Sequence, residues 1–62
     1  MGKLTLKAAR VNAGLTQKQA AQKLGIAQTT LHNYESGKSV PNIAMLQRIE
    51  DAYGVEYKDL FF

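Results

Sequence analysis

Three polar residues within one short segment have side chains suited to reading nucleic-acid bases: Gln28, Thr29 and Asn33. A terminal amide presents a donor and an acceptor side by side, which matches N6 and N7 of adenine in the major groove. A threonine hydroxyl can donate or accept, and its methyl group can contact thymine. In a helix, Thr29 and Asn33 lie one turn apart on nearly the same face. The alternative interpretation is a polar helix surface that faces only water.

Two short helices joined by a tight turn are predicted to position these side chains. Thr16 and Gln19 have the spacing of a capping box at the start of a helix over residues 17–24. Gly25 ends that helix, and a second helix is expected over residues 28–35. Apolar residues recur at helical spacing on the inner face of the pair: Ala20, Ala21, Leu24, Leu31 and Tyr34. This is the layout of a helix-turn-helix whose second helix can read DNA.

The same segment resembles the phage repressor and Cro (Xre-type) helix-turn-helix family. The matching residues are LTQ at 15–17, Ala21, Leu24-Gly25-Ile26, Gln28, Leu31, Tyr34-Glu35-Ser36-Gly37, Pro41 and GVEYKDLF at 54–61. The resemblance extends over about residues 6–61 and implies an all-α, lambda-repressor-like DNA-binding domain. It also implies a source in a bacterium, a phage or another mobile element, with double-stranded DNA as the partner. A cytoplasmic location is expected because the sequence has no long apolar run for a membrane span or a signal peptide.

Five helices in a compact bundle are expected, over residues 3–13, 17–24, 28–35, 43–53 and 57–61. Asn42 is the expected N-cap of the fourth helix. Two residues depart from the family pattern. Ala27 stands where Ser or Thr often caps the third helix, and Glu56 stands where a small hydroxyl residue often begins the fifth. The expected core is Leu6, Ala9, Ala13, Leu15, Ala20, Leu24, Ile26, Leu31, Tyr34, Ile43, Leu46, Ile49, Tyr53, Val55 and Leu60.

Several further residues are expected to contact DNA phosphates. Gln17 begins the first helix of the motif, where its N–H and side chain can bind a phosphate, and family resemblance implies that it braces Gln28. The loop after the third helix offers the N–H groups and side chains of Ser36, Lys38 and Ser39, and His32 can reach a phosphate from the helix surface.

The resemblance also implies a partly buried ion pair between Arg10 and Glu35, with Arg10 near a phosphate. The alternative is two unrelated surface charges, whose pairing would be worth little.

The charge distribution agrees with a polyanionic partner. Residues 1–40 carry six basic side chains against one acidic, a net +5, whereas residues 41–62 carry two against four, a net −2. The two halves sum to the formal charge of +3 for the 62-residue chain. A basic surface of this kind steers a protein toward DNA. Without the motif, a solvated lysine surface would be the simpler interpretation.

The composition excludes several other classes of function. A chain of 62 residues allows a single domain, here the whole of 1–62, with one small core. It has no cysteine and one histidine, so no metal site or cofactor is expected. It has no long apolar run for a membrane span. No Cys nucleophile, glycine-rich phosphate loop or carboxylate cluster with histidine is evident, and Ser36 and Ser39 have no base in reach, so an enzyme is not expected.

The C-terminal segment carries four large apolar residues: Tyr57, Leu60, Phe61 and Phe62. An exposed cluster of this type often marks an interface, and the family resemblance implies a homodimer on a palindromic operator. The aromatic residues could instead fold into the core, or be covered by a part of a longer protein. The leading interpretation is a transcriptional regulator, most simply a repressor. The alternative is an antitoxin or anti-repressor that uses this fold to bind a protein partner.

Overall fold

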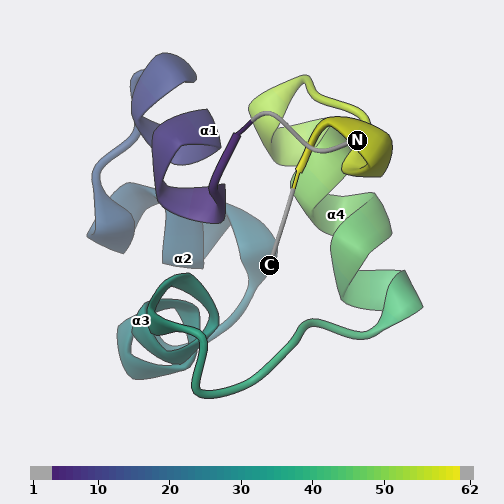
Figure 1. The fold of residues 1–62 in the computed structure, drawn as a ribbon. Coiled ribbons are helices and arrows are strands. Elements are labelled where there is room, and N and C mark those ends of the chain that lie inside the picture. Colours follow the sequence, from purple (N-terminus) through teal and green to yellow (C-terminus); the bar gives the residue numbers. More distant parts are fainter. Residues whose placement is uncertain (1–3, 61–62) are drawn as a thin grey trace.

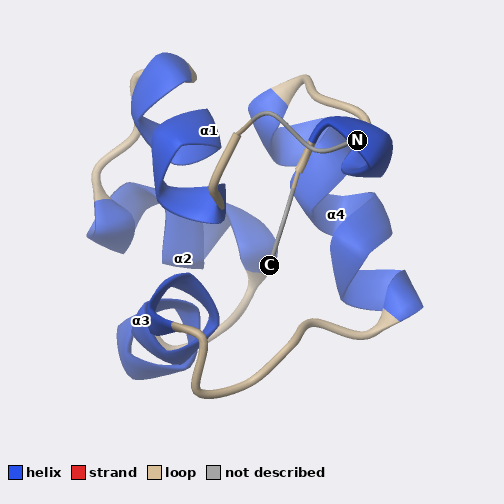
Figure 2. Cartoon of the chain, in the orientation of Figure 1, coloured by secondary structure: helices blue, strands red, loops and turns tan. Residues whose placement is uncertain are grey.

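A computed structural model describes residues 4–60, which form four α-helices and one short 3₁₀ turn. The elements are α1 (Leu6–Asn12), α2 (Gln17–Leu24), α3 (Gln28–Ser36), α4 (Ile43–Tyr53) and the turn η1 (Tyr57–Asp59). In Figure 1, α1, α2 and α3 are stacked on one side of the molecule and α4 lies opposite them. The expected all-α class is confirmed for this part of the chain, where Figure 2 shows only helices and loops.

The expected fifth helix is not present, because residues 57–59 form only a 3₁₀ turn. Glu56 makes no side-chain capping hydrogen bond. Its place as a cap is taken by Glu50 of α4, whose Oε2 accepts the backbone N–H of Tyr57 at 2.8 Å. Leu60 then becomes extended and forms an isolated parallel bridge with Leu4. The prediction of five helices is therefore wrong, since this pairing ends the turn after three residues.

The first helix begins later than expected, at Leu6 instead of residue 3. The backbone N–H of Leu4 donates to the carbonyl of Asp59 at 2.9 Å, which holds this residue in the bridge and outside the helix. Thr5 is the N-cap, and its Oγ1 accepts the N–H of Ala8 at 3.0 Å. A contact between the two ends of the described chain thus sets the start of α1.

Local capping sets the bounds of α2 and α4, which agree with the predicted ranges. Thr16 Oγ1 accepts the N–H of Gln19 at 3.1 Å, and Gln19 Oε1 accepts the N–H of Thr16 at 3.0 Å. Asn42 Oδ1 accepts the N–H of Met45 at 2.8 Å. Gly25 ends α2 with φ of +71°, a left-handed conformation that side-chain-bearing residues rarely adopt. The tight turn to α3 depends on this glycine.

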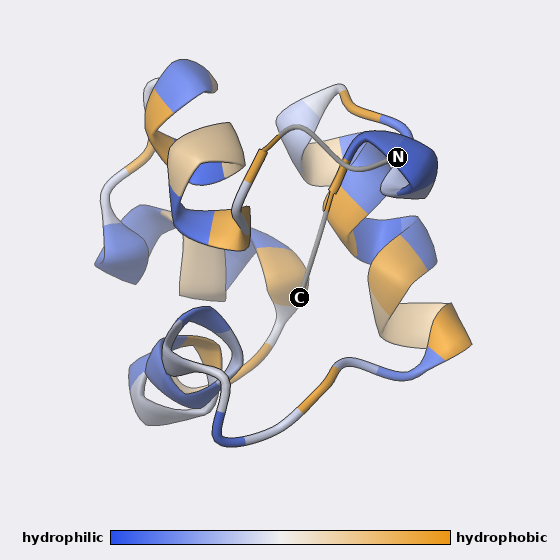
Figure 3. Cartoon of the chain, viewed as in Figure 1, coloured by the Kyte–Doolittle hydropathy of each residue, from blue (hydrophilic) through white to orange (hydrophobic). Residues whose placement is uncertain are grey.

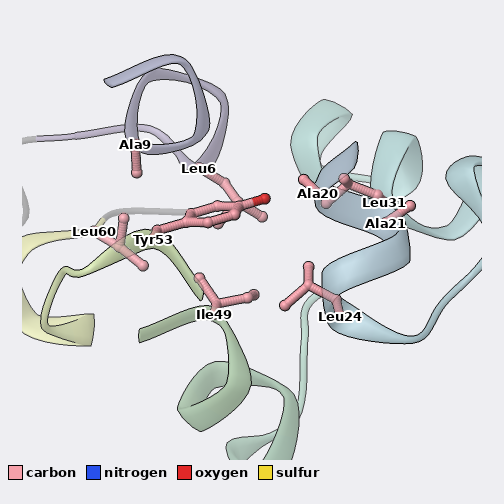
Figure 4. Close-up of a cluster of buried hydrophobic side chains, with 9 residues drawn as sticks. All are labelled: Leu6, Ala9, Ala20, Ala21, Leu24, Leu31, Ile49, Tyr53 and Leu60. Atoms are coloured by element: carbon pink, nitrogen blue, oxygen red, sulfur yellow. The ribbon is translucent and has the colours of Figure 1, made fainter. Parts of the chain in front are cut away.

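Nine buried apolar residues form a core between the two sides of the molecule (Figure 4). They are Leu6, Ala9, Ala20, Ala21, Leu24, Leu31, Ile49, Tyr53 and Leu60. The small side chains of Ala20 and Ala21 let α2 approach its neighbours α3 and α4 closely. Partly buried apolar residues pack around this cluster, among them the expected Leu15, Ile26, Tyr34 and Val55.

Three expected core residues lie outside the core cluster and the apolar residues packed against it. Ala13 is the C-cap of α1 and lies past the buried face of that helix. Ile43 is the first residue of α4 and is 75% exposed, because the start of this helix extends beyond the three helices opposite. Leu46, one turn further along, is partly exposed on the same outer face. Helical spacing predicted an apolar stripe on α4, but packing covers only part of it.

Candidate nucleic-acid interface

The start of α3 lies at the surface of the molecule. Gln28 and Thr29 are exposed, whereas Leu31 on the opposite face is completely buried. Asn33 is partly exposed and lies one turn beyond Thr29 on the outer face. In Figure 3 the ribbon of α3 is coloured mostly in the blue-to-white, hydrophilic part of the scale. The three residues predicted to read bases are therefore on one helix, with Gln28 and Thr29 exposed and Asn33 partly exposed.

Gln17 connects the start of α3 to the interior of the protein. Its Oε1 accepts a hydrogen bond from Gln28 Nε2 at 3.4 Å, and its own Nε2 donates to Glu35 Oε1 at 3.2 Å. A long glutamine side chain loses conformational entropy when it is held in one geometry. In this structure the hydrogen bond to Gln17 already restricts the Gln28 side chain. Part of its conformational entropy is therefore lost before any ligand binds.

Arg10 and Glu35 form an ion pair between α1 and α3. Arg10 Nε lies 2.8 Å from Glu35 Oε2, and the two side chains are only 10% and 6% exposed. Arg10 Nη2 also donates to Glu35 Oε1 at 3.4 Å, and Nη1 donates to the carbonyl of Leu15 at 2.9 Å. The pair thus joins α1, the loop before α2, and α3. All three guanidinium nitrogens of Arg10 are engaged within the protein.

Tyr53 of α4 lies close to this ion pair. Figure 4 shows its ring crossing the core, with the hydroxyl pointing away from α4. Burial raises the pKa of Tyr53 to about 12; the negative charge of Glu35 also raises it, and Arg10 acts in the opposite direction. Among the described residues the hydroxyl has no hydrogen-bond partner. The neutral form of Tyr53 is therefore strongly favoured in the folded chain.

Two adjoining hollows cover the surface between α1, α2 and α3. One has a volume of about 250 Å³ and is lined by Gln17, Gln28, Thr29 and His32. The other has a volume of about 350 Å³ and is lined by Lys7, Arg10, Gln17, His32, Glu35 and Ser36. Because both hollows include Gln17 and His32, they lie next to each other beside the start of α3.

The loop after α3 is less open to a ligand than its sequence indicates. The backbone N–H groups of Lys38 and Ser39 donate to the carbonyl of Asn33 at 3.0 and 3.3 Å. Ser36 Oγ also donates to this carbonyl, at 3.3 Å. The expectation that these two N–H groups are available to a phosphate is wrong, since they end α3. The side chains of Ser36, Lys38 and Ser39 remain exposed.

Two residues with notable positions were not identified from the sequence. Lys7 is exposed and lines the second hollow; its position three residues before Arg10 on α1 is the signal that could have found it. Arg48 of α4 donates from Nη1 to the carbonyl of Leu24 at 3.2 Å. This bond satisfies the last carbonyl of α2 next to the turn at Gly25, and no local pattern predicts it.

The C-terminal apolar group differs from the expectation. Leu60 is 6% exposed and belongs to the core, so it cannot contact a partner in this fold. Tyr57 is 62% exposed, and Phe61 and Phe62 lie outside the described residues. Tyr57 lines a hollow of about 300 Å³ together with Ile43, Leu46, Gln47 and Glu50. An apolar surface is therefore present, but α4 supplies most of it.

Two structural criteria bear on other classes of site. In residues 4–60, no three His, Cys, Asp or Glu side chains come together in a way that could hold a metal ion. No helix in this part of the chain is both long and apolar enough to cross a lipid bilayer.

The chain is matched over residues 6–60 by a family model described as a helix-turn-helix. It therefore belongs to the Xre-type helix-turn-helix family, as its motifs predict. It is 44% identical over 50 residues to the HTH-type transcriptional regulator ImmR of Bacillus subtilis strain 168, covering 81% of this chain and 39% of ImmR. No solved structure matched the chain significantly.

Eukaryotic proteins are also similar to the chain. Endothelial differentiation-related factor 1 of Homo sapiens is 39% identical over 49 residues, covering 79% of this chain and 33% of the relative. Multiprotein-bridging factor 1 of Eremothecium gossypii is 35% identical over 49 residues, covering 79% of this chain and 32% of the relative. The chain thus spans only about a third to two fifths of the length of these relatives.

Proposed function

We propose that the chain forms one DNA-binding domain of a transcriptional regulator, and that α3 enters the major groove of double-stranded DNA. This proposal rests mainly on one observation, the hydrogen bond by which Gln17 holds the side chain of Gln28. This exposed amide at the start of α3 is held by Gln17, which is itself held by the buried carboxylate of Glu35. A preorganised amide loses less entropy when it pairs with a base. The regulator named among the relatives, ImmR, supports the same function.

Individual contacts follow from this arrangement. Gln28, Thr29 and Asn33 read base edges, with the two amides favouring adenine. Phosphates are bound by the N–H and side chain of Gln17 at the start of α2, where the first N–H groups of a helix have no partner within the helix. The other phosphate contacts come from the exposed side chains of His32, Ser36, Lys38 and Ser39.

We further propose that the protein represses transcription as a homodimer on a palindromic operator. Ile43, Leu46 and Tyr57 supply an apolar face on α4 and η1 that a second copy can cover. In Figure 1 the start of α4 and α3 lie on different sides of the molecule. Two copies joined in this way can place their recognition helices in successive major grooves, about 34 Å apart.

The same apolar face supports a second candidate function, that of an antitoxin or anti-repressor that binds a protein partner. Ile43 is 75% exposed and Tyr57 is 62% exposed, which is unusual for large apolar side chains in so small a domain. One relative carries the name Multiprotein-bridging factor 1, which describes a protein that joins other proteins. A toxin-like gene beside that of this protein would favour this function, and a divergent promoter would favour the regulator.

A salt titration of binding to random-sequence duplex DNA tests the proposed function. We expect binding that weakens steeply as salt rises, because phosphate contacts release counterions. Lys38→Ala should reduce the slope by about 0.9. On an operator selected from random sequence, the Gln28→Ala, Asn33→Ala double variant should lose preference for that operator and keep its affinity for random DNA. Absence of binding even at low salt would exclude DNA binding by this chain and favour a protein partner.

A further inference from the structure

The hydroxyl of Tyr53 is a hydrogen-bond donor that the fold leaves unused. Tyr53 is 6% exposed, and its Oη has no hydrogen-bond partner among residues 4–60. A buried polar group without a partner destabilises a fold, and a phenylalanine of nearly the same shape would avoid this cost. Packing alone therefore does not account for this hydroxyl.

The hydroxyl lies near the buried ion pair of Arg10 and Glu35. Figure 4 shows the Tyr53 ring directed from α4 toward the side of the core that holds Ala20 and Leu31. The charges of Glu35 and Arg10 both act on Tyr53, and that of Glu35 acts more strongly. A guanidinium has no acceptor, so Glu35 is the member of the pair that can accept from the hydroxyl. The terminal torsion of a glutamate side chain is broad, so its carboxylate can turn toward a neighbouring donor at little cost.

One oxygen of Glu35 is held less tightly than the other. Arg10 Nε donates to Oε2 at 2.8 Å, whereas Oε1 accepts at 3.4 Å from Arg10 Nη2 and at 3.2 Å from Gln17 Nε2. Most N–H···O bonds are about 2.9–3.0 Å long, so both contacts at Oε1 are weak. The bond between Gln17 and Gln28 is also long, at 3.4 Å, and Gln17 is partly exposed. Gln17 can therefore leave Glu35 more easily than Arg10 can.

We propose that Tyr53 is a reserve donor for Glu35: when the side chain of Gln17 turns outward, the Tyr53 hydroxyl takes its place at Oε1. The exchange conserves the number of hydrogen bonds to a buried carboxylate, which would otherwise lose one. It leaves the bond from Arg10 Nε in place, so α1 and α3 stay joined. The use of this exchange rests on the proposed function, in which Gln17 binds a phosphate. Tyr53 is then a positioning residue that lets Gln17 move without disturbing the ion pair.

A double-mutant cycle between Tyr53→Phe and Gln17→Met, measured by urea denaturation, tests the exchange without DNA. In the unaltered chain the Tyr53 hydroxyl has no bond to lose, so Tyr53→Phe should leave the folding equilibrium constant unchanged or raise it. Gln17→Met removes the amide donor and keeps an unbranched side chain. In that background Tyr53→Phe should lower the constant by about tenfold or more, as expected for one lost hydrogen bond to a charged group.

Tyr57→Phe is the matched control, because Tyr57 is 62% exposed and its hydroxyl should matter in neither background. Equal effects of Tyr53→Phe in the two backgrounds would overturn the proposal, since the hydroxyl would then gain no partner when Gln17 is lost.

Nuclear magnetic resonance of the chain isotope-labelled at the tyrosine Cζ atom gives a second measurement, because the Cζ shift responds to hydrogen bonding of the hydroxyl. We expect the Tyr53 signal to move in Gln17→Met while the Tyr57 signal stays in place. Random-sequence duplex DNA added to the unaltered chain should move the Tyr53 signal in the same direction. An unmoved Tyr53 signal in Gln17→Met would overturn the proposal.

The arm with DNA separates this inference from the proposed function. DNA that binds without moving the Tyr53 signal would show that Gln17 does not leave Glu35 on binding, and would overturn the use of the exchange while leaving DNA binding in place. A chain that does not bind DNA at low salt would refute the proposed function, and the double-mutant cycle would still decide whether Tyr53 replaces Gln17.

Discussion

Removing one member of the Arg10–Glu35 ion pair should destabilise the protein far more than replacing both. The two side chains are 10% and 6% exposed and 2.8 Å apart. If Glu35 is replaced by Leu, the guanidinium of Arg10 stays buried and retains only its bond to the carbonyl of Leu15. An uncompensated buried charge of this type costs about 3–5 kcal/mol. A domain of this length has a total stability of about 3–9 kcal/mol, so the single variant should be close to unfolding.

The double variant Arg10→Met, Glu35→Leu should recover most of this loss. No charge is left in the interior, and the apolar side chains fill a similar volume. Two internal hydrogen bonds are still lost, from Gln17 to Glu35 and from Arg10 to Leu15, at about 1 kcal/mol each. We therefore expect a net cost of about 1–2 kcal/mol for the double variant, and a coupling energy of at least about 4 kcal/mol between the two sites.

Urea denaturation followed by far-ultraviolet circular dichroism measures all four members of this double-mutant cycle. The single variants should be measured near the temperature of maximum stability, about 10–20 °C. The buffer should contain an osmolyte that is excluded from the protein surface, such as sucrose, because it favours the folded state. The exposed pair of Lys58 and Glu56, whose atoms lie 3.2 Å apart, provides the matched control. Its cycle should give a coupling energy of about 0–1 kcal/mol.

Two results would refute this reasoning. If each single variant of Arg10 and Glu35 lost less than about 1 kcal/mol, the pair would behave like a surface contact. If the loss in the double variant equalled the sum of the two single losses, there would be no coupling, and the two residues would act independently. In either case the bracing of Gln17 by Glu35 could not depend on a charged, buried network.

Two further predictions concern the core and the start of α3. Raising the pH from 10 to 12 should lower the free energy of unfolding by about 2 kcal/mol, because burial raises the pKa of Tyr53 to about 12 from 10.0, so the unfolded chain loses this proton first. Urea titrations should show this loss in Tyr57→Phe but not in Tyr53→Phe, and a loss in both variants would contradict the assignment. Ala27→Ser should raise the melting temperature by about 4–8 °C, since α3 begins without a side-chain cap and a serine cap adds about 1 kcal/mol. An unchanged melting temperature would mean that the serine hydroxyl does not reach the N–H groups of α3.

Sequence reasoning succeeded where a structure depends on residues close together in the chain. The capping box of Thr16 and Gln19, the cap at Asn42 and the left-handed Gly25 each act within one helical turn. These interactions set the bounds of α2 and α4, and the family motifs around them identified the fold. The residue types at the start of α3 were also enough to suggest a base-reading surface.

Only the tertiary structure determined how distant residues combine. The pairing of Leu4 with Leu60 shortened α1 and ended the C-terminal turn, and Glu50 replaced the missing cap beside Tyr57. Packing left Ile43 outside the core although its spacing was helical. The links from Gln28 through Gln17 to Glu35 and Arg10 join three helices. Local patterns encode hydrogen bonds within a helix, but burial and long-range charge pairing arise only when the helices come together.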